Sequence, residues 1–274
     1  MSDFKNMLGK YFYYYFSKNF SKRVSKMSAK ATVDSVRMNM ISEMVIYYPE
    51  LLSEQEEVVN FFTKIDNCID AQEKLLTLLN KYKRGLISLT FSNKNGCKEF
   101  KLKELLQPYT SKNTSLYEPV AVGKYGIRKR SEIYSKILSK DISKNKVIEK
   151  NTFVIGMGSK QIDFGILYED VKYSVSPAYL TFKISKKINP KYLEEYLRNI
   201  LPILSFKFMI IGARQGKNID KEGFLNYSIY VPSIDRQNRI SDTLIALDKK
   251  IEKENELLLL LKQYKQGLLQ QMFI

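Results

Sequence analysis

Three short segments of this chain place basic and amide side chains beside glycines, a pattern suited to binding nucleic acid. They are GKYGIRKR at 123–130, GSKQ at 158–161 and GARQGKN at 212–218. Arg, Gln and Asn can bind base edges bidentately, whereas Lys mostly contacts phosphate. Each segment taken alone could equally be a solvated surface loop. We predict nucleic-acid contacts from Lys124, Arg128, Lys129, Arg130, Ser159, Lys160, Gln161, Arg214, Gln215, Lys217 and Asn218.

Two other patterns are typical of enzymes but match them poorly. VIGMGSK at 154–160 is a strand followed by Gly-x-Gly, but a dinucleotide site also needs a third glycine and a following helix. Residue 161 is Gln and another strand-like stretch follows, so we interpret this segment as a tight turn beside a binding surface. Asp163, Asp170 and Lys172 loosely resemble a metal-dependent nuclease core, and a nuclease is the alternative hypothesis from another class.

The composition excludes several kinds of active site. The 274 residues include no histidine, so histidine acid/base catalysis, Ser-His-Asp triads and His/Cys zinc sites are impossible. Cys68 and Cys97 are too few for a disulfide framework and are expected to be free thiols in a reducing cytoplasm. We find neither a signal-peptide pattern nor an apolar run near the ~20 residues that span a bilayer. We therefore predict a cytoplasmic protein without a histidine-based active site or a His/Cys metal site.

The charge points to a polyanionic partner. The formal net charge is +16, and residues 97–232 hold 24 Lys/Arg against 13 Asp/Glu, a net of +11. Such an excess is typical of nucleic-acid binding. A lysine-rich composition that only keeps the protein soluble is the alternative explanation.

An internal repeat organises the rest of the chain. Residues 55–91 and 237–273 align without gaps and are identical at 12 of 37 positions. Apolar residues recur in both copies with alternating steps of three and four, which is the seam of a coiled coil. Two seam positions, Gln72/Glu254 and Lys83/Lys265, are polar in both copies and are expected to fix the register. The repeat predicts two long antiparallel helices that meet at Val58, Phe62, Ile65, Ile69, Leu76, Leu79, Leu86, Ile240, Leu244, Leu247, Ile251, Leu258, Leu261 and Leu268.

Between the helices the sequence predicts a domain that mixes strands and helices. NTFVIGM at 151–157 and PAYLTFKI at 177–184 are rich in aromatic and β-branched residues, as strands are. Residues 189–208 read as one helix with Asn189 as N-cap, and a further strand ends at Pro232. The fold class is therefore α+β: one α/β domain plus two long antiparallel coiled-coil helices.

Residues 1–50 echo the end of that domain. MVIYYPELLSEQ at 44–55 resembles SIYVPSIDRQ at 228–237, with a strand-like run, a proline and then the helix. We therefore divide the chain into 1–50, the remnant of a first domain; 51–92, long helix 1; 97–232, the complete domain; and 233–274, long helix 2. The aromatic residues of YFYYYF at 11–16 are expected to be exposed, because the remnant lacks a full domain to pack against.

The pattern resembles the specificity (S) subunit of type I restriction–modification systems, over nearly the whole chain. That family alternates target-recognition domains with long conserved helices. The resemblance lies in IYYPELLSEQ and IYVPSIDRQ at the helix starts, with Arg236 in place of the usual Glu, and in YKRGLISLTF and YKQGLLQQMF at the helix ends. One target-recognition domain is complete and a second is represented by a remnant, so the chain looks like a truncated or rearranged S subunit.

The resemblance implies a non-catalytic DNA reader. It would direct methyltransferase (M) and restriction (R) subunits to a double-stranded DNA target, and S-adenosylmethionine, ATP and magnesium would belong to those subunits. Half-subunits of this kind could pair as a homodimer. A nuclease, or a non-functional fragment that serves as a recombination cassette, remains the alternative.

Overall fold

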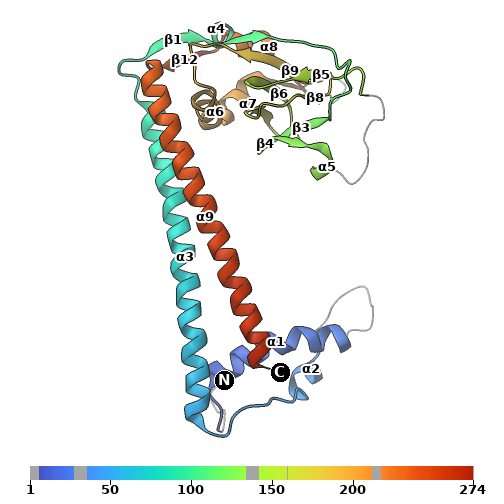
Figure 1. Cartoon of the computed structure of the whole chain (residues 1–274), viewed down its shortest axis with the longest axis vertical. Coiled ribbons are helices and arrows are strands. Elements are labelled where there is room, and N and C mark those ends of the chain that lie inside the picture. The colour runs from blue at the N-terminus through green and yellow to red at the C-terminus, as the bar shows by residue number, and fades with distance from the viewer. Residues whose placement is uncertain (1–5, 28–35, 134–141, 159, 212–216, 274) are drawn as a thin grey trace. The chain divides into compact units, whose positions relative to one another are not determined.

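The computed structural model describes residues 6–27, 36–133, 142–158, 160–211 and 217–273. The chain divides into two compact units. Unit 1 comprises Met1–Tyr82 and Leu247–Ile274, and unit 2 comprises Lys83–Ala246. Two long helices, α3 (Leu52–Ser92) and α9 (Ile234–Met272), contribute residues to both units (Figure 1). None of the described helices is both long and apolar enough to cross a membrane.

In unit 1 the two long helices run antiparallel. The Nζ of Lys265 lies 2.5 Å from Asp66 Oδ1, and the Nε2 of Gln72 donates to Glu254 Oε2 at 2.7 Å. Residue numbers thus increase from 66 to 72 along α3 while those of their partners on α9 decrease from 265 to 254. Gln72 therefore pairs with the residue that occupies its own position in the second repeat. A buried polar pair of this kind fixes the register of two helices, because a slip would leave both groups without partners.

The apolar residues that the repeat assigns to the seam are buried or half-buried in every case. The fully buried ones include Phe62 in unit 1 and Leu244 in unit 2, which are equivalent positions of the repeat. The outer faces of the helices carry exposed apolar side chains as well, among them Leu78, Tyr82 and Leu260. The heptad pattern alone does not separate these outward residues from the seam, because positions 257–261 are all leucine.

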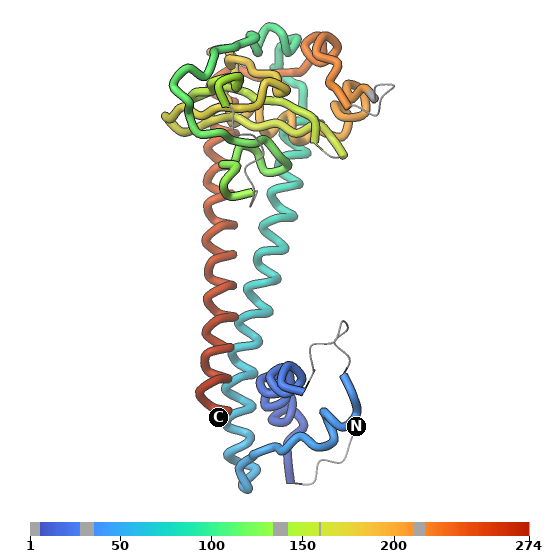
Figure 2. Tube along the Cα trace, turned by 90° about the vertical axis from the view of Figure 1, so that its right-hand side faces the viewer, coloured from blue at the N-terminus to red at the C-terminus, as the bar shows by residue number. Residues whose placement is uncertain are grey.

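Unit 1 is completed by α1 (Gly9–Met27) and α2 (Met38–Ser42). Figure 2 shows α1, in dark blue, beside the N-terminal part of α3. Tyr11, Tyr14 and Tyr15 are buried against the long helices, so the expectation that the aromatic run at 11–16 is exposed was wrong for these three. The Tyr14 hydroxyl donates to Asp66 Oδ2 at 2.7 Å. Burial, together with that carboxylate, raises the pKa of Tyr14 to about 12, so the hydroxyl remains a donor at neutral pH.

Unit 2 is built on one central antiparallel sheet in the order β2-β9-β6-β7. In β6, Phe153 lies opposite Ile166 of β7 and Phe182 of β9. The N-terminal part of the unit contains β1 (Lys98–Lys101), α4 (Leu102–Leu105), β2 (Leu106–Pro108), β3 (Val120–Gly123), β4 (Gly126–Lys129) and α5 (Arg130–Ile133). It continues with β5 (Lys146–Ile148), β6 (Thr152–Met157), β7 (Ile162–Ile166), β8 (Tyr173–Val175), β9 (Leu180–Ile184), α6 (Pro190–Asn199), α7 (Leu201–Phe208), β10 (Met209–Ile211), β11 (Lys217–Ile219), α8 (Lys221–Asn226) and β12 (Ser228–Val231).

Both faces of the central sheet are covered. Phe153 and Ile155 of β6 pack into the larger core with α6, α7 and α8. Val154, on the opposite face, packs into a second core with Val120 and Val122 of β3. Successive side chains of a strand point to opposite faces, so a strand that is covered on both sides reads as a continuous apolar run. This explains the sequence TFVIGM and fixes where the β3–β4 hairpin lies.

The predicted α+β fold with two long helices is confirmed. The predicted N-cap is also confirmed, because the Asn189 side chain accepts from the backbone N–H groups of Lys191 and Tyr192. The single helix expected over 189–208 is instead two helices, α6 and α7, which meet at Ile200. Pro202 follows this junction, and its missing N–H prevents a continuous ladder of helical hydrogen bonds. Residues 44–49 form no strand, although their sequence is strand-like.

Each unit contains the same set of contacts between a long helix and the segments packed against it, and we call this set the joint. It is centred on Gln237 in unit 2 and on Gln55 in unit 1. In unit 2, Gln237 Oε1 accepts from Asn189 N at 2.8 Å, and its Nε2 donates to the carbonyls of Lys187 and Pro232. In unit 1, Gln55 Oε1 accepts from Leu8 N at 2.8 Å, and its Nε2 donates to the carbonyls of Asn6 and Pro49. Gln55 and Gln237 are equivalent positions of the repeat, and both are buried.

Aromatic contacts complete the joint in the same way. Phe91 of α3 contacts Tyr192 and Tyr196 of α6, with ring centroids 5.4 and 5.1 Å apart. Phe273, its counterpart after α9, contacts Tyr11 and Tyr15 of α1 at 5.3 and 5.9 Å. Helix α1 in unit 1 therefore takes the position relative to its joint that α6 and α7 take in unit 2.

Candidate nucleic-acid interface

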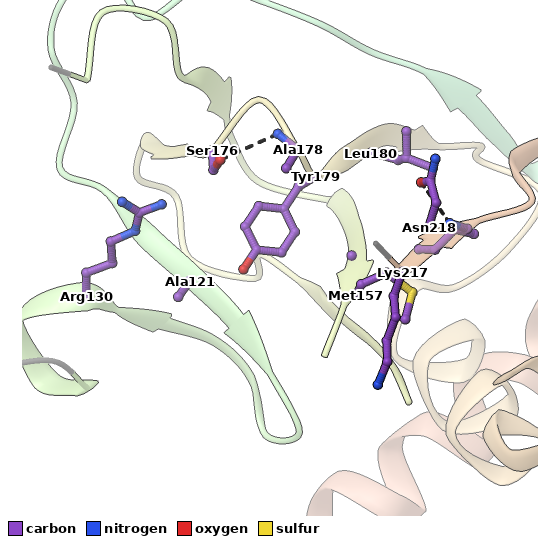
Figure 3. Close-up of a pocket in the computed structure, with 11 residues that line it drawn as sticks. Ala121, Arg130, Met157, Ser176, Ala178, Tyr179, Leu180, Lys217 and Asn218 are labelled. Atoms are coloured by element: carbon purple, nitrogen blue, oxygen red, sulfur yellow. Dashed lines mark hydrogen bonds between the residues drawn. The ribbon is translucent and has the colours of Figure 1, made fainter. Parts of the chain in front are cut away.

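A cavity of about 470 Å³ in unit 2 brings two of the three predicted segments together (Figure 3). Arg130 reaches it from the start of α5, and Lys217 and Asn218 reach it from β11. Residues Gly156 and Met157, which lead into the GSKQ segment, also line it. Among the described residues that line the cavity, these two side chains are basic and none is a carboxylate, which suits a phosphate or the acceptor edge of a base.

Tyr179 forms a fixed wall of this cavity. Figure 3 shows its ring between Arg130 and Lys217. Its hydroxyl lies 3.4 Å from Val122 N and 3.5 Å from Val122 O, which ties the ring to β3. The ring also lies directly over Gly156, where a Cβ would come within 2.3 Å of it. Any larger residue at 156 would displace the ring, so the glycine is required for the shape of the cavity.

Gly158, Lys160 and Gln161, the described residues of the GSKQ segment, lie in the short connection between β6 and β7. Met157 lies opposite Ile162 across the strand pair, and Gly158 N donates to Gln161 O at 2.9 Å. The interpretation as a tight turn is confirmed, and no helix follows the Gly-x-Gly pattern as a dinucleotide site requires. Lys160 is exposed in this turn and Gln161 is half-buried.

The GKYGIRKR segment forms the β3–β4 hairpin, with Lys124 and Tyr125 at its tip. Gly126 has a φ of +88°, which glycine adopts without a steric penalty. Lys124 and Arg128 are exposed and lie 5.6 and 5.0 Å from the Tyr125 ring. Lys129 pairs with Glu118 at 3.1 Å, and this carboxylate raises the lysine's pKa. Lys129 is thus held by an ion pair, whereas the hairpin tip is open to a ligand.

Three of the predicted contact residues, Ser159, Arg214 and Gln215, lie outside the described residues. Their prediction rests on the sequence alone. Of their described neighbours, Lys217 lines the cavity. Gly158 and Lys160 lie in the connection between β6 and β7.

Arg198 of α6 is a residue that the sequence did not single out. Its Nη2 lies 2.6 Å from Glu194 Oε1, and its Nη1 donates to the carbonyl of Lys124 at 3.1 Å. The Tyr168 hydroxyl donates to the other oxygen of Glu194 at 2.6 Å. Burial and this carboxylate raise the pKa of Tyr168, so it stays protonated. This network fixes the hairpin tip to α6. The sequence does not reveal the role of Arg198, because its partner at the hairpin is a backbone carbonyl, which every residue has.

A second cavity, of about 510 Å³, is lined by other residues of the hairpin. It is lined by Arg128 and Lys129 but also by Glu132, Glu169 and Glu194. The carboxylates would repel a phosphate backbone. The cavity lined by Arg130 and Lys217 is therefore the better candidate.

The residues behind the nuclease hypothesis lie on β7 and on the following loop. Asp163 is half-buried on β7, and burial raises its pKa. Asp170 and Lys172 are exposed in the loop before β8. Over the described part of the chain, no cluster of three or more Cys, Asp or Glu residues is placed to hold a metal ion.

Comparison with known proteins gives a consistent result. The family model described as type I restriction modification DNA specificity domain matches residues 2–81 and 94–263. The structure is similar to a type I restriction–modification S subunit from M. genitalium, with a TM-score of 0.58 and 14% identity over 97% of this chain and 72% of that one. A chain from a structure titled for complex assembly and conformational transition of the type I R-M system gives 0.54 and 14%, over 97% and 71%. An HsdS subunit from Thermoanaerobacter tengcongensis gives 0.49 and 14%, over 96% and 69%.

Proposed function

Because this chain belongs to the type I restriction–modification DNA specificity family, we propose that it is a subunit that reads one DNA half-site and does no chemistry itself. Unit 2 is the target-recognition domain in this proposal. Side chains around the cavity contact base edges, and lysines at the hairpin tip and the β6–β7 turn fix the phosphate register.

The observation that carries this proposal is the meeting of Arg130, Lys217 and Asn218 at one cavity, although about 90 residues of sequence separate the first from the others. The fixed Tyr179 wall supports it, since direct readout requires side chains held in a defined geometry. The charge of unit 2 supports it too, because a basic surface gives the sequence-independent part of DNA affinity.

Partners would supply the chemistry. We propose that methyltransferase subunits, with S-adenosylmethionine, and restriction subunits, with ATP and magnesium, assemble with this chain in the cytoplasm. A homodimer would join two recognition domains and so read two half-sites. The methylated motif would then be palindromic, because a twofold dimer presents the same surface twice.

The test is to co-express the chain with a type I methyltransferase subunit and to sequence the methylated bases of the host genome. We expect a stable complex and one bipartite methylated motif. Arg130→Ala and Lys217→Ala should each weaken binding to that motif by about 1–3 kcal/mol if they contact base edges. Lys253→Ala, an exposed lysine on α9, is the matched control.

Two results would contradict the proposal. One is a complex that forms but methylates no defined motif. The other is an equal effect of Arg130→Ala, Lys217→Ala and Lys253→Ala on binding. Metal-dependent nicking by the purified chain, abolished by Asp163→Asn, would instead support the nuclease hypothesis.

A further inference from the structure

Asp163 is an acidic side chain on the sheet face that adjoins the cavity lined by Arg130 and Lys217. It lies directly opposite Gly156 in the β6–β7 pair. Side chains directly opposite each other in an antiparallel pair project from the same face of the sheet. A Cβ on Gly156 would meet the ring of Tyr179, so Asp163 projects from the face on which that ring lies. The carboxylate therefore stands beside the cavity without lining it.

The other predicted contact segments border Asp163 as well. Two residues further along β7, Gly165 lies against the β3–β4 hairpin, where its Cβ would come within 2.9 Å of Ile127 N. Gly165 and Asp163 share a face, because residues two apart on a strand do so. In the β6–β7 connection, a Cβ on Gly158 would come within 2.2 Å of Asp163 Oδ2. The carboxylate thus lies between the hairpin, the β6–β7 connection and the aromatic wall of the cavity.

An amide side chain orients this carboxylate. The Gln161 side chain is hydrogen-bonded to the Asp163 carboxylate. Burial raises the pKa of Asp163, whereas the hydrogen bond with Gln161 and the charge of Arg198 oppose that rise and favour the ionised form. Gln161 and Asp163 are both half-buried, so each keeps some surface open to solvent. The two side chains therefore present an oriented acceptor that a ligand can reach.

The chemistry of this acceptor differs from that of the basic segments around it. Arginine and lysine donate to phosphate and to the acceptor edge of guanine, whereas a carboxylate repels phosphate. The major-groove group that donates to a carboxylate is an exocyclic amino group, N4 of cytosine or N6 of adenine. An acidic acceptor among the predicted contact segments therefore indicates contact with a base and not with the phosphate backbone.

We propose that Asp163, oriented by Gln161, accepts a hydrogen bond from the exocyclic amino group of one base in the half-site and so determines specificity at that position. Guanine and thymine present an oxygen acceptor at the corresponding place, which would face the carboxylate without a proton between them. They are rejected by this repulsion as well as by the lost hydrogen bond. The inference rests on the proposed function of unit 2, and it gives Asp163 a role in reading DNA in place of the metal chemistry of the nuclease hypothesis.

The experiment starts from the motif that the native chain methylates in complex with its methyltransferase subunit. Each adenine or cytosine of the half-site is replaced, one at a time, by the analogue without the amino group: purine for adenine, 2-pyrimidinone for cytosine. Fluorescence anisotropy measures binding of the complex to each duplex. We expect one replacement to weaken binding on the order of tenfold in the native complex and to have little further effect in the Asp163→Ala complex. The identity of that base distinguishes adenine from cytosine as the source of the amino group.

The comparison of analogues separates base reading from a structural role. A carboxylate that only supports the β6–β7 connection would weaken binding to every duplex by the same factor when it is removed. The adenine that the methyltransferase subunit modifies is expected to respond to replacement as well, but equally in the native and Asp163→Ala complexes. Asp242→Asn removes a carboxylate at an exposed position of α9 and is the matched control, which should respond to the analogues as the native complex does.

Asp163→Asn is the second variant, and it keeps the size of the side chain. Its amide can donate to the oxygen of guanine or thymine, so we expect the methylated motif to become relaxed at the same position that the analogues identify. The cycle of analogues is run with this variant if Asp163→Ala does not assemble with the methyltransferase subunit. Urea denaturation of both variants measures any structural effect separately.

The inference is wrong if no replacement couples to Asp163, or if the motif of Asp163→Asn is as strict as the native one. Metal-dependent nicking that Asp163→Asn abolishes would also overturn it, because the carboxylate would then hold a metal ion. A defined motif without coupling contradicts this inference alone. The absence of any defined motif contradicts the proposed function, so the two failures are distinguishable.

Discussion

At the scale of single residues, two glutamines hold the two joints together. Gln237 satisfies the Asn189 N–H and two carbonyl groups at a site that is 1% exposed. Gln55 does the same for Leu8 and two carbonyls at 0% exposure. Only a side chain with both a donor and an acceptor at this length can serve all three groups.

We therefore predict that Gln237→Ala lowers the free energy of unfolding by about 1–3 kcal/mol, because it leaves buried backbone groups without partners. Urea denaturation of the purified chain measures this effect. Gln263→Ala, at an exposed position of α9, is the control and should stay within about 0.5 kcal/mol of the parent. Equal stability of the two variants would show that water replaces the glutamine at no cost.

The sequence identifies these glutamines only in part. Their identity at equivalent positions of the repeat is visible, and so is that of Phe91 and Phe273. Their partners are backbone groups and tyrosines on segments that share little sequence: α1 and α6 agree at Lys10/Lys191, Tyr11/Tyr192 and Tyr15/Tyr196. A backbone carbonyl has no residue type, so the joint became apparent only from the contacts.

At the scale of elements, the β3–β4 hairpin depends on two contacts outside itself. Its backbone lies against Gly165 of β7, where a Cβ would come within 2.9 Å of Ile127 N. Its tip is held by Arg198, which joins the Lys124 carbonyl to Glu194. The hairpin carries three of the predicted contact residues, Lys124, Arg128 and Lys129, so Arg198 is a positioning residue for them.

We predict that Arg198→Ala weakens specific DNA binding more than it lowers stability. Stability should fall by about 1–3 kcal/mol, because Glu194 loses a charged hydrogen-bond partner. Hydrogen exchange at the amides of Tyr125 and Gly126 should become faster. Arg198→Lys retains the charge but cannot bridge both partners, so we expect it to restore stability better than binding. Binding loss that matches the stability loss in both variants would argue against a positioning role.

Most elements could be predicted from local sequence, and the exceptions share one cause. Periodicity located α3, α9, β6, β9 and α6, because each carries its own apolar pattern. It failed at 44–49, where a strand-like run has no strand beside it in the part of the chain that the structure describes, and at Tyr11, Tyr14 and Tyr15, which are buried against helices far along the chain. It also could not place the three basic segments relative to one another. Whether a residue is buried, whether a run becomes a strand and where a segment lies all depend on partners distant in the sequence. A local sequence pattern does not encode those partners.

At the scale of the whole molecule, charge should dominate binding to any DNA. With a net charge of +16, we predict that DNA affinity falls as salt rises, so that log Kd increases linearly with log salt with a slope of about 0.9 per phosphate neutralised. Fluorescence anisotropy with the methylated motif and with random DNA, over 50–200 mM salt as an order-of-magnitude range, measures both slopes. Specific and random DNA should share most of the slope. A flat dependence on salt would mean that the positive charge does not face the DNA.

The doubled joint has a consequence for how such chains can change over generations. The joint of unit 2 is formed by the side chains of Phe91, Tyr192, Tyr196 and Gln237. All four lie outside residues 98–187, which form most of the sheet. Crossovers between related genes at the two borders of that stretch would exchange the part of the proposed DNA-contact surface that carries Arg130, and would leave Lys217, Asn218 and the residues of the joint in place. A new target could then arise in one genetic step, without passing through chains that fail to fold.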